Sequence, residues 1–221
     1  MPVNIQKYNQ ILTELNGKAT FMAVSKTKPA EDILELYNLG QRDFGENYVQ
    51  ELVDKYEQLP KDIRWHFIGH LQSNKVKYIA PFVHLIHGVD SENLLKEINK
   101  QGAKNNRVID CLLQVHIAQE ETKFGFDNHE LGELHQLHKL TNVRVCGLMG
   151  MASFTTDENL IRKEFKFLKD IYSSIKLPST INHQLSTLSM GMSSDYKIAI
   201  EEGGNMVRIG SLLFGERNYN K

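Results

Sequence analysis

The chain has 221 residues, of which 41% are hydrophobic and 24% charged, a composition typical of a globular protein. Its 26 lysine and arginine residues balance 27 aspartate and glutamate residues, and the net charge of −1 gives no sign of a nucleic-acid partner. No apolar run is long enough to span a bilayer, and the N-terminus lacks the apolar segment of a signal peptide. Cys111 and Cys146, the two cysteines, lie in apolar runs. We therefore expect a cytoplasmic protein without a membrane partner.

Short apolar segments alternate with amphipathic ones along the whole chain, and no linker rich in proline, glycine or serine divides it. In chain order the first half predicts a helix over Gln6–Asn16, a strand over Ala19–Val24, a helix over Ala30–Leu39, a strand over Asp43–Phe44, a helix over Glu46–Gln58, a strand over Trp65–Gly69, a helix over Ser73–Ala80, a strand over Val83–Val89 and a helix over Ser91–Gln101. The second half predicts a strand over Val108–Ile117, a helix over Asn128–Leu140, a strand over Val143–Met149, a helix over Glu158–Ile175, a strand over Leu185–Met190, a helix over Ser193–Glu202 and a last strand over Met206–Ile209.

Each predicted strand except the last is followed by a helix, and one extra helix precedes the first strand. Buried strands that alternate with helices imply parallel βαβ units. Eight such units favour one domain over residues 1–221, an α/β fold of the (β/α)₈ TIM-barrel type with an extra N-terminal helix. An open doubly wound sheet is the alternative. In a barrel the functional residues stand at the C-terminal ends of the strands.

Lys26 follows the first predicted strand directly and is the leading candidate for chemistry. Partial desolvation at a barrel mouth lowers the pKa of a lysine, and a neutral amine forms a Schiff base with a carbonyl. The alternative is an ordinary lysine in a surface loop. Lys28, the local competitor, lies further from the strand and is expected to face solvent.

Two loops late in the chain are compatible with phosphate binding. Hydroxyl-rich residues between Ser186 and Asp195 lead into a helix, where free backbone N–H groups attract anions. After the last strand come Arg208, Gly210 and Ser211. The loops after the seventh and eighth strands are the usual phosphate site of barrel enzymes. Helix capping alone is the alternative explanation for these serines.

The histidines show no metal-ligand spacing, so we expect no metal site. His66 and His70 flank the third predicted strand, and His70 is placed to reach the mouth of the barrel. His84 and His87 flank the fourth strand and are interpreted as core or rim residues.

Five ordered motifs resemble one known family. They are Ala23–Pro29 (AVSKTKP), Phe44–Glu51 (FGENYVQE), Trp65–Lys75 (WHFIGHLQSNK), Leu188–Asp195 (LSMGMSSD) and Val207–Ser211 (VRIGS), the last followed by Phe214 and Gly215. The chain resembles the pyridoxal phosphate homeostasis proteins (the YggS/PROSC type) from about residue 6 to residue 217. The resemblance implies a barrel like the N-terminal domain of alanine racemase.

The resemblance also implies a pyridoxal 5′-phosphate (PLP) site without a catalytic residue. Lys26 would hold PLP as a covalent aldimine, and Arg208 would face its pyridine nitrogen. The phosphate would lie against Ser189, Gly210 and Ser211. Asn47 would lie beside the ring, and Met149 or His70 could line the pocket.

Arginine only donates hydrogen bonds, so a ring nitrogen opposite Arg208 stays unprotonated and PLP is a weaker electron sink. The resemblance accordingly implies a carrier or buffer in intracellular PLP (vitamin B6) homeostasis, with PLP-dependent apoenzymes as candidate partners. The first alternative is a PLP-dependent amino-acid racemase. Racemases of the alanine type take a second base from an added domain, whereas only six residues follow Gly215, with Tyr219 among them. We therefore expect a non-catalytic monomer. The second alternative is a cofactor-free aldolase that uses Lys26.

Overall fold

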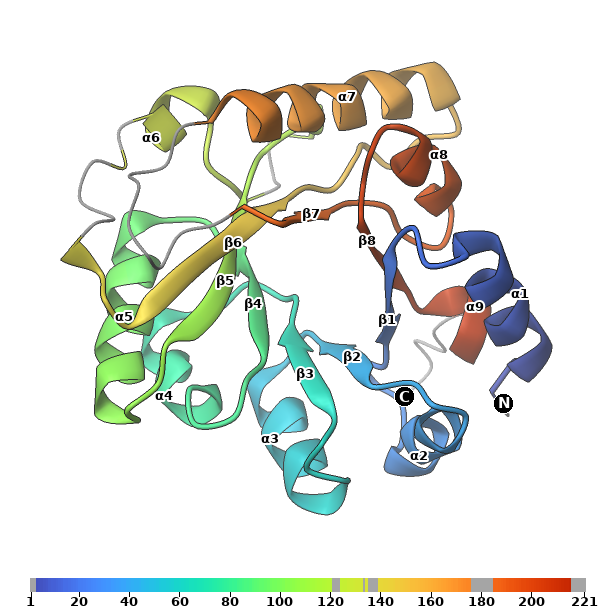
Figure 1. The fold of residues 1–221 in the computed structure, drawn as a ribbon, viewed down its shortest axis with the longest axis horizontal. Coiled ribbons are helices and arrows are strands. Elements are labelled where there is room, and N and C mark those ends of the chain that lie inside the picture. The colour runs from blue at the N-terminus through green and yellow to red at the C-terminus, as the bar shows by residue number, and fades with distance from the viewer. Residues whose placement is uncertain (1–2, 121–123, 133, 135–138, 176–184, 216–221) are drawn as a thin grey trace.

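The strands form a closed parallel barrel. The computed structural model describes residues 3–120, 124–132, 134, 139–175 and 185–215. Each strand pairs in parallel with the next along the chain, and the first pairs with the last. The strands are β1 (Thr20–Val24), β2 (Asp43–Glu46), β3 (Arg64–Phe67), β4 (Leu85–Val89), β5 (Ile109–Gln114), β6 (Val143–Met149), β7 (Thr187–Ser189) and β8 (Met206–Ile209) (Figure 1). The predicted (β/α)₈ barrel is confirmed, and the β1–β8 pairing excludes an open sheet.

Helices surround the barrel (Figure 1). They are α1 (Ile5–Leu15), α2 (Ala30–Asn38), α3 (Val49–Gln58), the 3₁₀ turn η1 (Ser73–Lys75), α4 (Val76–Ile79), α5 (Glu92–Lys104), α6 (Asn128–Gly132), α7 (Glu158–Ser174), α8 (Tyr196–Glu201) and α9 (Ser211–Phe214). The extra N-terminal helix α1 packs beside α9, and the backbone N–H of Asn4 donates to Leu213 O at 2.8 Å.

Local sequence signals explain several helix ends. The Ser91 hydroxyl accepts the backbone N–H of Leu94 at 3.4 Å and caps α5, as its sequence predicts. Asp157 caps α7 in the same way, through the backbone N–H groups of its second and third following residues. Helix α1 ends at Leu15 because the next residue, Asn16, has a left-handed φ of +43°, and Gly17 continues that conformation.

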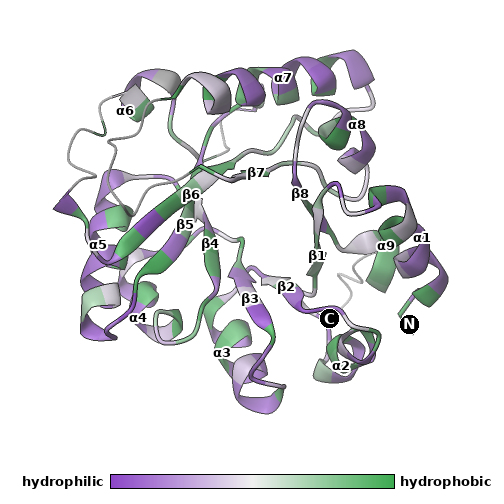
Figure 2. Ribbon diagram, in the orientation of Figure 1, coloured by the Kyte–Doolittle hydropathy of each residue, from purple (hydrophilic) through white to green (hydrophobic). Residues whose placement is uncertain are grey.

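The strands separate an outer apolar layer from a more polar interior. Outward side chains such as Phe44, Trp65 and Ile86 pack with the inner faces of the helices in one large cluster. In Figure 2, hydrophobic residues prevail on β1 and β4, whereas helices such as α5 and α7 carry both hydrophobic and hydrophilic residues. The smaller second cluster contains Leu85, Leu112, Met149 and Met206. Buried polar residues such as His66, His87 and Arg208 occupy the rest of the interior.

Two predicted helices and one helix that was not predicted illustrate where the structure differs from the sequence-based expectation. Residue Glu46 ends β2 and pairs with Phe67 instead of starting α3, which begins at Val49. The helix predicted over Asn128–Leu140 is described only as far as Gly132, and part of its remainder lies outside the described residues. The last strand is followed by a short helix, α9, because the apolar run after Gly210 folds back onto α1.

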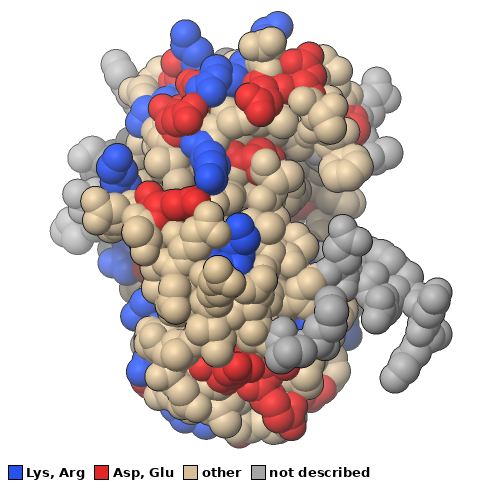
Figure 3. All heavy atoms as spheres, turned by 90° about the vertical axis from the view of Figure 1, so that its right-hand side faces the viewer, with Lys and Arg blue, Asp and Glu red and all other residues tan. Residues whose placement is uncertain are grey.

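Charged side chains are unevenly spread over the face that carries α1, α8 and α9 (Figure 3). The middle of this face is largely uncharged and acidic side chains gather near its lower end, whereas basic and acidic side chains lie side by side over its upper part. One example is the pair formed by Lys197 of α8 and Glu14 of α1, whose atoms Nζ and Oε2 are 3.2 Å apart. In the part of the chain that the structure describes, no helix combines the length and apolar character needed to cross a membrane.

Candidate functional site at the barrel mouth

Lys26 stands just beyond the C-terminal end of β1. A Cβ atom added to Gly45 would meet the Met22 sulfur at 2.6 Å, so Met22 points into the barrel. The ladder continues beyond β1, because the backbone N–H of Ser25 donates to Gly45 O at 3.0 Å. Strand alternation therefore puts Met22, Val24 and Lys26 on the interior side. The side chain of Lys26 is half-buried at the mouth, where the sequence predicts it.

Contrary to the prediction, Lys28 does not face solvent. Its ammonium donates to the carbonyl oxygen of Phe214 at 2.7 Å and is partly buried. That carbonyl belongs to the last residue of α9, where a cation satisfies an otherwise unpaired acceptor. The two lysines near the end of β1 thus have different roles, since Lys28 joins the loop to α9.

A buried ionic cluster on the outer side of β2 fixes the loop around Lys26. Lys55 of α3 donates to Glu46 Oε1 at 2.8 Å, to Glu51 Oε1 at 2.7 Å and to Ser25 O at 2.8 Å. The Ser25 hydroxyl donates to Glu46 Oε1 at 2.6 Å, and the backbone N–H of Thr27 donates to Glu51 Oε1 at 2.5 Å. Both neighbours of Lys26 are therefore held by α3 and β2. Thr27 has a left-handed φ of +64°, so the chain turns sharply after the lysine.

Burial raises the pKa of Glu46 to about 7, against the opposing effect of Lys55 and Ser25. Its second carboxylate oxygen, Oε2, is buried without a hydrogen-bond partner among the described residues. An ionised carboxylate with one unsolvated oxygen is costly, which is the physical reason for the raised pKa. The motif containing Glu46 was noticed in the sequence, but its role in the Lys26 loop was not predicted.

Arg208 brings a buried cation to the barrel interior from β8. Its NH1 donates to the carbonyl and the hydroxyl of Ser189, each at 2.8 Å, and NH2 donates to Gly150 O at 2.9 Å. All three acceptors are neutral. Burial lowers the pKa of Arg208 to about 10, and the charge of Asp195 opposes this shift. The group remains a cation at neutral pH and is fixed in orientation by its acceptors.

The loops after β7 and β8 meet at the mouth. Gly191 has a φ of +89°, and a Cβ atom there would lie 2.5 Å from the Ala199 side chain, so this position requires glycine. The Ser193 hydroxyl accepts the backbone N–H of Gly210 at 3.2 Å. Ser211, next in the chain, is exposed. The hydroxyl of the β7 loop that contacts the Gly210–Ser211 segment is therefore that of Ser193. Ser193 lies in the loop for which the sequence predicts phosphate binding, but it was not among the predicted site residues.

Ser189 is the last residue of β7 and faces the interior of the barrel. Its side chain is fully buried and contacts Arg208 and His87. Its two hydrogen-bonding neighbours are interior side chains. This position favours support of Arg208 over contact with a phosphate at the mouth.

Asn47 and His70 complete the rim, as their positions after β2 and β3 predict. Asn47 is half-buried, and its side-chain oxygen Oδ1 is buried with no hydrogen-bond partner among the described residues. His70 is exposed, bonds Asp90 Oδ2 through Nδ1 at 3.0 Å and stacks on Phe124 at a centroid distance of 4.2 Å. Met149 is buried in the interior apolar cluster.

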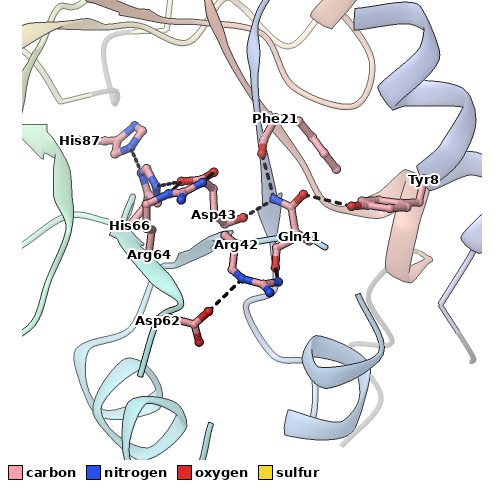
Figure 4. A network of polar contacts seen from close by, with 9 residues as sticks. All are labelled: Tyr8, Phe21, Gln41, Arg42, Asp43, Asp62, Arg64, His66 and His87. Carbon is pink, nitrogen blue, oxygen red and sulfur yellow. Dashed lines mark hydrogen bonds and ion pairs between the residues drawn. The ribbon is translucent and has the colours of Figure 1, made fainter. Parts of the chain in front are cut away.

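A polar group at the opposite end of the barrel was not found from the sequence. Asp43 bonds His66 at 3.0 Å and pairs through both carboxylate oxygens with Arg64 (Figure 4). Within the described residues, Asp43, His66 and His84 are the group close enough together to hold a metal ion. Because Arg64 already occupies both oxygens of Asp43, we interpret the group as a hydrogen-bonded cluster. The sequence signal was the alternation of outward Trp65 with the polar residues Arg64 and His66 on either side.

Fold and site together define a closed (β/α)₈ barrel with a lysine after β1 and a buried arginine on β8. Residues 3–218 match the family of the alanine racemase N-terminal domain. The pyridoxal phosphate homeostasis protein of Aquifex aeolicus (strain VF5) is 47% identical over 203 residues, which cover 91% of this chain and 88% of that protein. The chain belongs to this family of pyridoxal phosphate homeostasis proteins.

Solved structures agree with the assignment. PipY of Synechococcus elongatus PCC7942, solved without PLP, is 34% identical, has a TM-score of 0.89 and matches 95% of this chain and 99% of its own. A second structure of PipY has PLP bound and a TM-score of 0.87. Alanine racemase of Clostridium difficile 630 has a TM-score of 0.74 at 15% identity, with 100% of this chain covering 60% of that chain, a likeness of fold alone.

Proposed function

We propose that this chain binds PLP at the barrel mouth as a Schiff base with Lys26 and serves as a PLP carrier or buffer in vitamin B6 homeostasis. The observation that carries the proposal is the convergence of Lys26, Arg208 and the bare Gly210 backbone at one end of the barrel. PipY, a relative that covers nearly the same length, has been solved with PLP bound. When bound, PLP supplies an aldehyde that adds amines reversibly.

The donor set fits PLP. An arginine has five N–H donors, and the neutral acceptors around Arg208 leave capacity for a ring nitrogen. A Cβ atom on Gly210 would lie 3.0 Å from Val24 O, so the backbone at this position approaches β1 closely and leaves no side chain in the mouth. The unpartnered oxygen of Asn47 is a buried acceptor beside that space. We assign the phosphate to Gly210, Ser211 and Ser193, and we assign Ser189 to the support of Arg208.

Arg208 favours holding PLP over transforming amino acids with it. A guanidinium donates a hydrogen bond and does not give up its proton at neutral pH, so the ring nitrogen opposite it stays an acceptor. The unprotonated ring withdraws electrons less strongly, which disfavours reactions that need a stabilised carbanion. A carrier is compatible with this arrangement, because release requires only that another amine replaces Lys26.

A transfer experiment tests the carrier role. The PLP-loaded protein, freed of unbound PLP, is mixed with the apo form of a PLP-dependent aminotransferase, and recovery of aminotransferase activity is followed. The proposal expects recovery faster than PLP release into buffer permits. It also expects no exchange of α-protons with solvent across a panel of free amino acids. Exchange with one amino acid would contradict the carrier role and favour a racemase.

We also propose that the protein is a cytoplasmic monomer. The two cysteines, buried Cys111 and half-buried Cys146, are both free thiols, as suits a reducing compartment. Gel filtration at micromolar concentration is expected to give the mass of one 25.4 kDa chain. Elution at twice that mass would contradict the monomer. The racemase-type second base considered at Tyr219 lies outside the described residues.

A further inference from the structure

A line of buried polar side chains crosses the barrel from its N-terminal end to the proposed cofactor site. Its members come from β2, β3, β4, β7 and β8 and are all at most 7% exposed: Asp43, His66, His87, Ser189 and Arg208. The contacts run from Asp43 Oδ1 to His66 Nε2 at 3.0 Å, from His66 Nδ1 to His87 Nε2 at 2.9 Å, and from His87 Nδ1 to Ser189 Oγ at 3.2 Å. Ser189 Oγ then meets Arg208 NH1 at 2.8 Å. Figure 4 shows the part from Asp43 to His87.

The two ends of this line fix the direction of its hydrogen bonds. Arg208 only donates, so Ser189 Oγ accepts there. At the other end, Arg64 and His66 hold the pKa of Asp43 well below its usual value although burial opposes them, so Asp43 is an ionised acceptor.

With neutral imidazoles, the Ser189 hydroxyl must donate to His87 Nδ1 and His87 Nε2–H must donate to His66 Nδ1. The remaining proton, on His66 Nε2, donates to Asp43. Both rings are then Nε2–H tautomers.

The opposite direction leaves a hydrogen without an acceptor. If His66 were a cation, it would donate to His87, and His87 would donate to Ser189 Oγ. Arg208 and His87 would then both donate to this oxygen, and the structure gives Ser189 Oγ no other partner among the described residues. A buried hydroxyl hydrogen without an acceptor is costly. The titratable and charged groups around the pair are Asp43, Arg64, His84 and Arg208. Burial lowers the pKa of His87 well below its usual value, and positive charge on His66, Arg208 or His84 lowers it further.

We propose that His66 and His87 are positioning residues of the cofactor site, which act on it through Ser189 and Arg208. As a neutral relay of fixed direction, they hold the Ser189 oxygen as an acceptor for Arg208 and connect the buried guanidinium to the carboxylate of Asp43. This proposal rests on the proposed PLP site. In it, the relay sets the orientation of the guanidinium toward the ring nitrogen of PLP.

Two substitutions at one position separate the relay from simple packing. His87→Gln keeps an acceptor oxygen for Ser189 and an N–H donor for His66, so it preserves the direction of the relay. His87→Leu fills much of the same space without either group. His129→Gln, on the exposed start of α6, is the matched control. The readouts are the dissociation constant for PLP and the absorption maximum of the bound form.

The relay predicts that His87→Leu weakens PLP binding about tenfold, as expected when a hydrogen bond to a charged group is disturbed, and shifts the absorption maximum. His87→Gln is expected to restore both to the values of the wild type and of His129→Gln. Equal values for His87→Leu and the wild type would overturn the proposal. So would equal losses in His87→Leu and His87→Gln, because those would report packing alone.

A measurement without PLP keeps this test independent of the proposed function. In protein with ¹⁵N-labelled histidine, two-bond proton–nitrogen correlations distinguish the two neutral tautomers and the imidazolium. We expect Nε2–H tautomers for His66 and His87, assigned by comparison with His87→Gln and His66→Gln. An Nδ1–H tautomer or an imidazolium at either position would overturn the relay. Failure of the wild type to bind PLP, with the expected tautomers present, would instead refute the proposed function.

Discussion

The raised pKa of Glu46 predicts a pH-dependent loss of stability that one substitution removes. Glu46, the last residue of β2, is fully buried, and its carboxylate bonds Ser25 and Lys55 through one oxygen only. In Glu46→Gln the side chain keeps its size and an acceptor oxygen but no longer titrates. The lost attraction to Lys55 changes stability by a constant offset. The prediction concerns the change of stability with pH that is added to this constant offset.

The magnitude follows from the two pKa values. Burial raises the pKa of Glu46 from its ordinary 4.5 to about 7 in the folded protein. The folded state therefore binds the proton more tightly than the unfolded state. The resulting stability is fully present below pH 4.5 and is lost as the pH rises through about 7. At 1.36 kcal/mol for each pKa unit, the total is about 3 kcal/mol.

Urea unfolding of the wild type and Glu46→Gln, at several pH values from about 5 to 8, measures this effect. Relative to the wild type, the free energy of unfolding of Glu46→Gln is expected to rise across this range by about 2–3 kcal/mol. Glu57→Gln removes the same charge from an exposed position of α3 and is the control, with no such trend expected. A constant difference between Glu46→Gln and the wild type would refute the reasoning.

Three further predictions concern packing, capping and transfer. A Cβ atom at Gly147 would lie within 2 Å of Thr187 O, so Gly147→Ala should lower the free energy of unfolding by about 3 kcal/mol or more. Gly132 has open space around it, so Gly132→Ala should leave the free energy of unfolding nearly unchanged. Equal unfolding curves for the two variants would contradict this prediction. Asp157→Ala removes the cap of α7 and should cost about 1 kcal/mol in the same assay, and no loss would count against the cap. Phe154 lies on the loop after β6 and is 96% exposed, so it should contribute to contact with a recipient enzyme. Phe154→Ser should then slow PLP transfer without changing PLP affinity. An unchanged transfer rate would exclude this contact.

The barrel was predictable because its signals are local. Each short apolar strand is followed by a segment of helical period, and capping residues such as Ser91 mark the boundaries. Lys26 was predictable for the same reason, since a residue directly after a strand of a barrel stands at its mouth. The helix α9 was missed because four residues are too few to show a helical period.

The interior network was not predictable, because its contacts join residues far apart in the sequence. His87 and Ser189 are 102 positions apart and meet only because β4 and β7 face each other across the barrel. In the sequence both looked ordinary, His87 as a core or rim histidine and Ser189 as a phosphate ligand. Ser193 was passed over because the hydroxyl-rich loop offers several serines, and its turn at Gly191 determines which one reaches Gly210.

Reductive trapping tests the central claim most directly. The protein is incubated with PLP, reduced with borohydride and digested, and the peptides are mapped by mass spectrometry. The account predicts one pyridoxyl adduct, on Lys26, which is lost in Lys26→Ala and kept in Lys28→Ala. An adduct on Lys28, or a wild-type protein that remains unmodified, would contradict it.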